Sequence, residues 1–269
     1  MGIPQDGLQS SISMALLVSK ANSISMFLDT TIGRNFVRIY AENVVVICHG
    51  LPYEPLPVIA KGYDELAEFF GEMGLNSVIF DFSGTGLSEG KFRILSWVED
   101  LIEIVEKFKS VHIVAFSLGG VPATYVARLK AVKSIALLAT PCCFDVMRKD
   151  LIKKAYDHAL TKKSLKGVGS FEEFYENFKR DVEDFAPVKW IDKVRCPILL
   201  VHGDRDDVIP FESSKRLYEN AKDAYFLEVR NGGHRLREYG VVMEIVAKWV
   251  AGNYVKGEAW DERWKVVEV

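Results

Sequence analysis

Cysteine is scarce in this sequence. The chain of 269 residues contains four cysteines, none of them in a C-x-x-C pattern, which argues against a disulfide framework and against a cysteine-based metal site. Cys142 and Cys143 are adjacent, an arrangement that rarely forms a bridge, whereas Cys48 and Cys196 fall at or beside apolar runs. Unbridged cysteines are typical of a reducing compartment, so we expect a cytoplasmic protein.

A cationic excess and a long apolar run are also absent. The sequence has 34 basic and 37 acidic residues, for a net charge of -3, which gives no electrostatic reason to bind nucleic acid or an anionic membrane. The apolar stretch Ile12–Val18 is too short to span a bilayer. The first six residues contain no basic region, and Asp6 disrupts an acylation pattern. We therefore expect no membrane span, no targeting signal and a small-molecule substrate.

The glycine-rich stretch at residues 84–91 does not fit a phosphate-binding loop. Thr85 stands where a P-loop requires glycine, and Phe92 stands where it requires serine or threonine. Glu89 replaces a glycine that a dinucleotide-binding fingerprint requires. We therefore expect neither a cofactor nor a metal.

Strand-like and helix-like segments alternate along most of the chain. With 49% hydrophobic residues, the chain can bury one large core. The pattern predicts an α/β protein with a mainly parallel eight-stranded sheet and helices on both faces. The expected strands are 23–29, 35–41, 43–48, 76–81, 111–116, 132–139, 196–202 and 223–229. The expected helices are 62–73, 93–109, 118–130, 211–221 and 236–251.

Residues 142–190 interrupt this alternation. We interpret them as a small helical cap inserted into a body formed by residues 1–141 and 191–269. Ser170 and Glu173 form a capping box, and a stripe of aromatic and apolar residues at helical spacing follows. The favoured interpretation is that this stripe packs the insertion onto the body. The alternative is that its inner face, with Phe174 and Phe178, lines an acyl or aryl pocket.

Ser117 occupies a strand-to-helix turn. The apolar run Val111–Phe116 ends at this serine, and helix-compatible sequence follows it. Such a turn exposes a serine hydroxyl above the sheet, provided that its neighbours are small, as Ala115 and Gly119 are. Ala115 departs from the usual G-x-S-x-G pattern at its first position. The alternative role is a plain helix N-cap; the favoured role is a nucleophile.

A serine nucleophile requires a base and an acid that orients the base. His234 follows Asn231-Gly232-Gly233 in a loop near the C-terminal end, and it is the favoured base. His112, His158, His49 and His202 are assigned to strands, strand ends or solvent. Asp206 is the favoured acid, while Asp204 and Asp207 are interpreted as turn or capping residues. The chain order is then serine, aspartate, histidine.

With these residues in place, the sequence resembles the α/β-hydrolase superfamily of serine hydrolases, whose catalytic residues follow this order. The resemblance rests on residues 44–52, which end in His-Gly-Leu-Pro, on residues 81–88, on the Ser117 turn and on the Asp206 and His234 loops. It implies a triad of Ser117, Asp206 and His234 and an oxyanion hole formed by the backbone N–H groups of Leu51 and Leu118. The sequence looks most similar to microbial carboxylesterases and acyl-peptidase-like hydrolases. The His-Gly-x-Pro form also occurs in epoxide hydrolases and haloalkane dehalogenases, but those use an aspartate nucleophile.

The expected activity is the hydrolysis of carboxylic esters of small or medium acyl or aryl groups through an acyl-serine. A peptidase or amidase, a thioesterase or lactonase, and a non-catalytic binding protein are the alternatives. Candidate substrate contacts are Tyr53, Cys142, Phe174 and Phe178, although Tyr53 also fits a proline-rich turn, the role we favour for it. The segment 260–269 is interpreted as an extra strand, a packed tail or a contact in a homo-oligomer.

Overall fold

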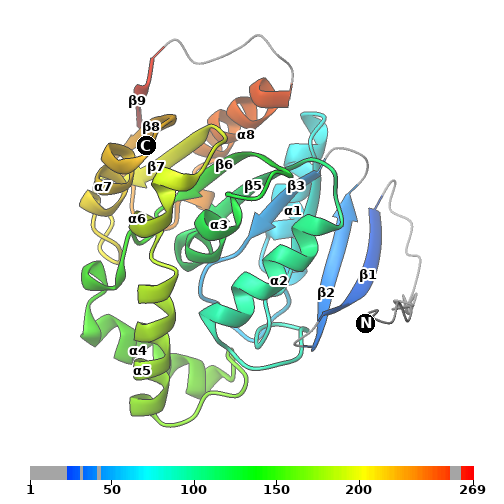
Figure 1. Ribbon diagram of the computed structural model, residues 1–269, viewed down its shortest axis with the longest axis vertical. Helices are drawn as coiled ribbons and strands as arrows, with labels where there is room; N and C mark the ends of the chain where they lie inside the picture. The colour runs from blue at the N-terminus through cyan, green and yellow to red at the C-terminus, as the bar shows by residue number, and fades with distance from the viewer. Residues whose placement is uncertain (1–22, 31–32, 41–43, 255–261) are drawn as a thin grey trace, which may run out of the picture.

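The computed structural model describes residues 23–30, 33–40, 44–254 and 262–269. Within these ranges nine strands form one sheet in the order β1-β2-β4-β3-β5-β6-β7-β8-β9 (Figure 1). The pairs β1–β2 and β2–β4 are antiparallel, and the other pairs are parallel. The strands are β1 Ser23–Thr30, β2 Gly33–Tyr40, β3 Val44–Cys48, β4 Asn76–Phe80, β5 Val111–Phe116, β6 Val132–Leu138, β7 Ile198–Gly203, β8 Ala224–Arg230 and β9 Trp264–Glu268.

The central strands read as continuous apolar runs because helices cover both of their faces. Alternate residues of β3 illustrate this: Val44, Val46 and Cys48 join one core cluster, and Val45 and Ile47 join the other. The helices α1 (Tyr63–Glu72) and α8 (Gly240–Tyr254) pack on one face, and α2 (Ile94–Glu106), α3 (Gly120–Val126) and α7 (Glu212–Asn220) pack on the other. The predicted two-faced α/β architecture is confirmed.

All eight predicted strands are present, with small shifts at their ends, and a ninth is added. Strand β9 runs parallel to β8, and the ring of Trp264 stacks on Phe226 with 4.2 Å between centroids. Of the three interpretations of the C-terminal segment, the extra strand describes residues 264–268. Residues 260 and 261, the stretch 12–18 and Asp6 lie outside the described residues.

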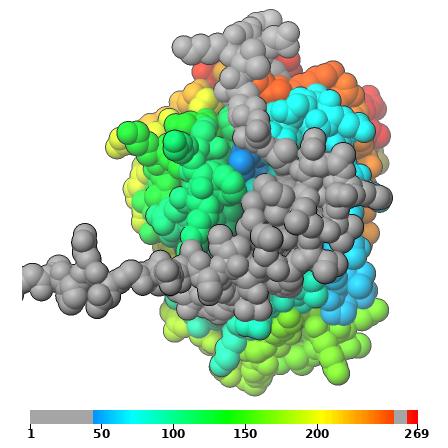
Figure 2. Space-filling model, turned by 90° about the vertical axis from the view of Figure 1, so that its right-hand side faces the viewer, coloured from blue at the N-terminus to red at the C-terminus, as the bar shows by residue number. Residues whose placement is uncertain are grey.

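The insertion lies between β6 and β7. It contains a 3₁₀ helix at Phe144–Val146, followed by α4 (Lys149–Lys162), α5 (Phe171–Asp184) and α6 (Pro187–Trp190). Ser170 accepts a hydrogen bond from the backbone N–H of Glu173 at 3.2 Å, so the predicted N-cap is formed. Figures 1 and 2 show residues 149–184 gathered at the lower end of the body. The boundaries at residues 142 and 190 stay a prediction.

Hydrogen bonds from the backbone and side chain of Lys166 bind the insertion to the body. Lys166 accepts a hydrogen bond from the N–H of Phe92 and donates its own N–H to the carbonyl of Gly84. Its ammonium group also donates to the carbonyls of Gly86 and Ser88, both at 2.8 Å. These contacts fix the segment between α4 and α5 against the loop that follows β4.

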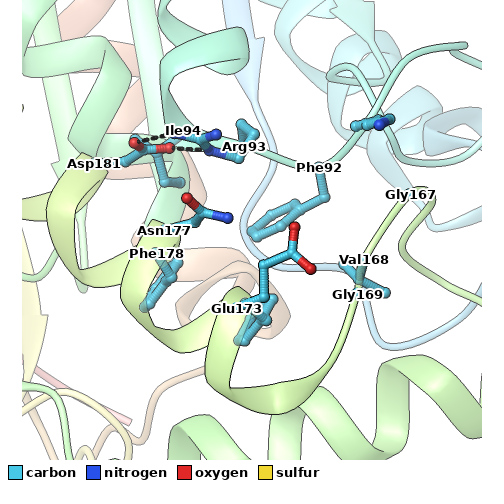
Figure 3. A pocket seen from close by; sticks show the side chains of 12 residues that line it. Phe92, Arg93, Ile94, Gly167, Val168, Gly169, Glu173, Asn177, Phe178 and Asp181 are labelled. Carbon is cyan, nitrogen blue, oxygen red and sulfur yellow. Dashed lines mark hydrogen bonds and ion pairs between the residues drawn. The ribbon is translucent and has the colours of Figure 1, made fainter.

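Aromatic packing adds to this attachment. The rings of Phe174 and Phe178 stack on each other and on Phe92, with centroid distances of 5.7, 5.8 and 6.4 Å. A cavity of about 150 Å³ lies beside these rings, between α5 and the loop that leads into α2, and Figure 3 shows Asn177 and Glu173 on its α5 side. The aromatic stripe therefore packs the insertion onto the body, as the favoured interpretation holds.

Candidate active site

Ser117 lies directly after β5 in an unusual backbone conformation. Its φ angle is +48°, in the left-handed region that non-glycine residues seldom adopt and that functional sites often contain. A short 3₁₀ helix at Ser117–Gly119 precedes α3, in place of the single helix predicted from residue 118. The strand thus turns sharply at the serine, and the side chain is raised at the carboxyl end of the sheet.

The loop after β3 packs against this turn. A Cβ atom at Gly119 would lie 2.4 Å from the carbonyl oxygen of His49, and one at Gly50 would lie 3.1 Å from the Cβ atom of Ser117. A side chain at position 119 would therefore force the two segments apart, and only glycine permits this approach. The close contact places the backbone of residues 49–51 beside Ser117.

Ser117, His234 and Asp206 form a continuous chain of hydrogen bonds. Nε2 of His234 lies 2.9 Å from Oγ of Ser117, and Nδ1 lies 2.7 Å from Oδ2 of Asp206. When Nδ1 carries the proton and donates it to the carboxylate, Nε2 is free to accept the serine proton. The side chain of Asp206 is buried, and that of His234 is 18% exposed, so the base remains within reach of solvent.

The carboxylate of Asp206 is held on both of its oxygens. Oδ1 accepts the backbone N–H groups of Val208 and Ile209, each at 2.9 Å, and Oδ2 lies 3.2 Å from Nε2 of His202. Burial raises the pKa of Asp206, but hydrogen bonds from His202 and His234 outweigh it and lower that pKa well below its ordinary value. The acid is therefore ionised at neutral pH.

His202 was expected to make hydrogen bonds at a strand end, and it does so beside Asp206. Its Nε2 also lies 3.0 Å from the carbonyl oxygen of Ile209, and its Nδ1 lies 2.7 Å from Oγ of Ser214. Sequence reasoning did not connect this histidine with the acid. A His-Gly-x-x-Asp spacing places the two side chains four residues apart across one turn, which is the signal that could have revealed the contact.

His49 holds the backbone of Gly50. His49 Nδ1 lies 2.6 Å from the Gly50 carbonyl, and its Nε2 accepts the N–H of Phe82 at 3.1 Å, so Nδ1 is the protonated nitrogen. Burial lowers the pKa of His49 to about 3, which keeps the ring neutral. Because C=O and N–H point in opposite directions across a trans peptide, a Gly50 carbonyl directed at His49 turns the N–H of Leu51 the other way.

Tyr63, the first residue of α1, contacts three segments of the site. Its ring lies edge-on to the ring of His49 at 6.3 Å and to that of Phe116 at 5.8 Å, and the guanidinium of Arg237 lies 4.1 Å from the ring centroid. Burial raises the pKa of its hydroxyl, and the charge of Arg237 and the backbone of Gly50 oppose that shift. The expected helix at residues 62–73 includes Tyr63, and nothing in the sequence connected this residue with the site. Its position beside the functional loops depends on how that helix packs, which one sequence does not reveal.

The four candidate substrate contacts, Tyr53, Cys142, Phe174 and Phe178, make their contacts with other residues than Ser117, Asp206 and His234. Tyr53 is 55% exposed, and its carbonyl is 2.8 Å from Nε2 of His158 on α4. Cys142 is buried and donates its N–H to Ser213, while Phe174 and Phe178 are buried in the stack with Phe92. Among the described residues, no hydrogen bond joins any of these four to Ser117, Asp206 or His234. Their contact with substrate stays a prediction.

The sequence matches the alpha/beta hydrolase family over residues 45–243. This range covers most of the chain, and the protein therefore belongs to the alpha/beta hydrolase family. Its sheet order and the serine at the turn after β5 agree with that membership.

Two curated relatives illustrate the range of the family. The chain is 26% identical over 209 residues to the uncharacterized protein YqkD of Bacillus subtilis, which covers 73% of this chain and 66% of the relative. It is 24% identical to the human palmitoyl-protein thioesterase ABHD10, mitochondrial, over 199 residues. The matched region covers 67% of this chain and 64% of the relative. The matches span slightly less than two thirds of the length of these relatives.

Solved structures share the fold at low identity. The carboxylesterase CesB of Bacillus subtilis superimposes with a TM-score of 0.65 at 14% identity, covering 89% of this chain and 94% of the other. The monoacylglycerol lipase of Paleococcus ferrophilus superimposes with a TM-score of 0.64 at 17% identity, covering 81% and 99%. Within the described residues, no helix has the length and hydropathy to cross a bilayer, and no group of three or more His, Cys, Asp or Glu side chains is placed to hold a metal.

Proposed function

We propose that the protein is a serine hydrolase that cleaves carboxylic esters through an acyl-serine, with Ser117, His234 and Asp206 as its catalytic triad. The observation that carries the proposal is the unbroken bonding from Ser117 Oγ to His234 and from His234 to Asp206, at 2.9 and 2.7 Å. Serine and imidazole at this separation are within the range for proton transfer. Membership of the alpha/beta hydrolase family supports the same conclusion.

The first half of the reaction forms the acyl-enzyme. His234 takes the proton of Ser117 as Oγ bonds to the carbonyl carbon of the ester, and the Asp206 carboxylate stabilises the imidazolium. The N–H groups of Leu51 and Leu118 receive the developing oxyanion. The alcohol then leaves with the proton that His234 held, and Ser117 remains as the ester of the acyl group.

The second half repeats these steps with water. His234 removes a proton from water as its oxygen attacks the acyl carbon, and the same N–H groups stabilise the second oxyanion. Collapse of that intermediate returns the proton to Ser117 and releases the carboxylic acid. The proposal requires no group beyond the side chains and backbone of this chain.

Small and medium acyl or aryl esters are the proposed substrates, and thioesters are the second candidate. The similarity to CesB, whose name gives a carboxylesterase, supports the first, whereas the relative ABHD10 is named as a palmitoyl-protein thioesterase. A peptidase would use the same three residues. The triad chemistry is common to all of these, so the acyl and leaving groups must be found by assay.

Initial rates on p-nitrophenyl esters from acetate to palmitate test the proposal, together with palmitoyl-CoA as a thioester and an aminoacyl p-nitroanilide. We expect ester turnover with a chain-length optimum in the wild type and a loss of nearly all turnover in Ser117→Ala. Faster thioester or anilide cleavage, again dependent on Ser117, would move the assignment to the corresponding class. Equal ester rates in wild type and Ser117→Ala would overturn the triad.

A further inference from the structure

The sulfurs of Cys142 and Cys143 lie 3.3 Å apart, although these residues are neighbours in sequence. Successive side chains of an extended chain point to opposite sides, and the φ and ψ angles of Cys143 are −163° and 174°. Two thiols on one side of such a chain therefore require a specific local backbone. All four cysteines are free, and Cys48 and Cys196 stand at the end of β3 and just before β7.

The backbone of Cys142 is fixed on both sides. Its N–H donates to Oγ of Ser213 at 2.6 Å, and that hydroxyl donates to the carbonyl of Thr140 at 2.9 Å. Its carbonyl accepts the N–H of Val188 at 3.0 Å. Beyond the pair, Nη1 of Arg216 lies 3.5 Å from the sulfur of Cys143. The paired arrangement of the thiols is thus built into the fold.

The spacing of the sulfurs suits a single thiophilic atom that bonds both. Two bonds of about 2.3 Å, the usual metal–thiolate length, at an angle of roughly 90° place the sulfurs about 3.3 Å apart. A pyramidal three-coordinate centre such as trivalent arsenic meets this requirement with two protein sulfurs. Tetrahedral zinc does not, because structural zinc takes four ligands and the described residues hold no third His, Cys, Asp or Glu in a cluster here.

Closure to a disulfide fits less well than bridging. Adjacent Cα atoms are about 3.8 Å apart, shorter than the separation of roughly 4.4 to 6.8 Å across ordinary disulfides. Bonding the sulfurs to each other would also move them together by more than an ångström from their 3.3 Å separation. A bridging atom leaves them where they are.

We propose that Cys142 and Cys143 form a vicinal dithiol site that captures a soft, thiophilic centre, with trivalent arsenicals as the ligand class. Cys143 is 8% exposed and Cys142 is fully buried, so Cys143 forms the first bond and Cys142 closes the chelate. With phenylarsine oxide, two As–S bonds form and the As–O bond breaks. The two thiol protons leave with that oxygen as water, and no oxidant or reductant is needed.

Occupation of the site is expected to disturb the insertion. Phe144, which follows the pair, packs its ring against Tyr175 and Phe178 of α5 at 5.7 and 6.2 Å. The pair also follows the carboxyl end of β6, and Ser117 follows the carboxyl end of the neighbouring parallel strand β5. An aryl group attached at Cys143 therefore displaces contacts between the insertion and the body, and we expect slower ester turnover. This last expectation rests on the proposed function, whereas capture does not.

Thiol counting and intact mass test the capture without reference to activity. The folded protein is treated with one equivalent of phenylarsine oxide, freed of excess reagent, denatured and titrated with a chromogenic disulfide. We expect one phenylarsenic adduct per chain and a fall from four free thiols to two. An unchanged count of four thiols with no adduct would overturn the proposal.

Matched variants locate the site. Cys143→Ser leaves one sulfur of the pair and should bind the arsenical roughly 100-fold more weakly, because the second attachment is lost. Cys196→Ser is the control, since Cys196 is also 8% exposed and should leave binding unchanged. Equal affinity in wild type and Cys143→Ser would show that the pair is not the site.

Turnover gives the second measurement, each variant being compared with its own untreated rate. Arsenical treatment should slow p-nitrophenyl ester hydrolysis by wild type and Cys196→Ser, and a dithiol should restore it while a monothiol at equal concentration should not. Cys143→Ser should keep its rate. If the arsenical binds and ester turnover is unchanged, the dithiol site stands but its expected effect on the insertion is rejected. An enzyme without esterase activity would fail this assay yet still show the thiol count.

Discussion

Asp206 is the most firmly anchored side chain of the candidate active site. Two backbone N–H groups hold Oδ1, and two histidines, His202 and His234, approach Oδ2. Its neighbour Asp204 is exposed at the turn. This contrast makes the pair a direct test of which aspartate orients the base.

Asp206→Asn should reduce kcat on p-nitrophenyl esters by about 10⁴-fold, because an amide at this position favours the wrong tautomer of the base. Asp204→Asn should retain nearly wild-type kcat. Steady-state rates of the two purified variants, with circular dichroism to confirm folding, make the comparison. Near-normal kcat in Asp206→Asn together with an inactive Asp204→Asn would show that Asp204, and not Asp206, is the acid.

Tyr63 packs against His49 at the start of the loop that carries Leu51, whose N–H is one of the two proposed oxyanion donors. Tyr63→Phe removes only the buried hydroxyl beside this loop. Deleting an oxyanion donor outright lowers kcat by about 10²- to 10³-fold. Tyr63→Phe leaves the donor in place and alters only its surroundings, so kcat should fall by less, about tenfold. KM should stay unchanged. Tyr125→Phe, at a half-buried tyrosine on α3, is the control. A higher KM at constant kcat would contradict a role in positioning.

The sequence singles out the three residues of the proposed triad, which the structure brings into hydrogen-bond contact, better than it predicts their surroundings. Ser117, Asp206 and His234 stand out because each follows an apolar run or sits in a glycine-rich loop, and local order along the chain is enough to find them. His202, His49 and Tyr63 act through neighbours that are distant in sequence, such as Phe82. Their contacts arise from packing, for which periodicity carries no information.

Helix α2 begins without a cap from its own sequence. Arg93 occupies the N-cap position, and no side chain there accepts a hydrogen bond. Asp181 of α5 fills this role: its Oδ2 accepts the N–H of Leu95 at 3.4 Å, and its carboxylate forms a two-point ion pair with Arg93 at 2.7 Å. A residue of the insertion thus completes a helix of the body, where a carboxylate also complements the helix dipole.

Asp181→Asn should lower the free energy of unfolding by about 1 to 3 kcal/mol, the contribution of hydrogen bonds that involve charged groups. Asp184→Asn, on the same helix but exposed, should change it by less than about 0.5 kcal/mol. Urea unfolding measures both. In Asp181→Asn, amide hydrogen exchange should become faster in α5 and in the first turn of α2. Equal protection in the two variants would show that the contact between Asp181 and the start of α2 does not hold the insertion.

The presence of the strands and the two-faced covering follow from patterns that the sequence carries, whereas the order of the strands in the sheet was not predicted. Apolar runs of five to seven residues alternate with amphipathic segments, and these predict a parallel sheet. The short helix α6 and the 3₁₀ turns were not predicted, because segments of three or four residues carry too little periodicity. Strand β9 was one of three interpretations, since only its pairing with β8 identifies it.

Buried histidines make the stability of the whole molecule depend on pH. Burial lowers the pKa of His49 to about 3 and that of His112 to about 4, from an ordinary value of 6.5. Between these values the unfolded chain binds protons that the folded chain does not, so acid favours unfolding. The contribution is complete above about pH 6.5 and is lost as the pH falls toward about 4 for His112 and about 3 for His49.

The urea midpoint should therefore change little between pH 7.5 and about 6.5 and fall steadily from there to pH 5. His112→Gln keeps a polar side chain next to Ser134, which lies 2.6 Å from Nδ1 of His112, and removes one of the titrating groups, so its midpoint should fall less over the same range. Asp206, whose pKa is also lowered, adds a further loss below about pH 4. Parallel pH curves for wild type and His112→Gln would rule out this contribution.

The hydrogen bond from Val188 to Cys142 closes the insertion at its base. The start and the end of the insertion are joined there, so the body has the same contact whatever sequence lies between. Lengthening the insertion would add only an entropic cost of loop closure that grows slowly with length. The intervening residues can thus change in length or sequence at little cost to the sheet. Replacement of this one segment would leave the strands, and the turn that carries Ser117, in place.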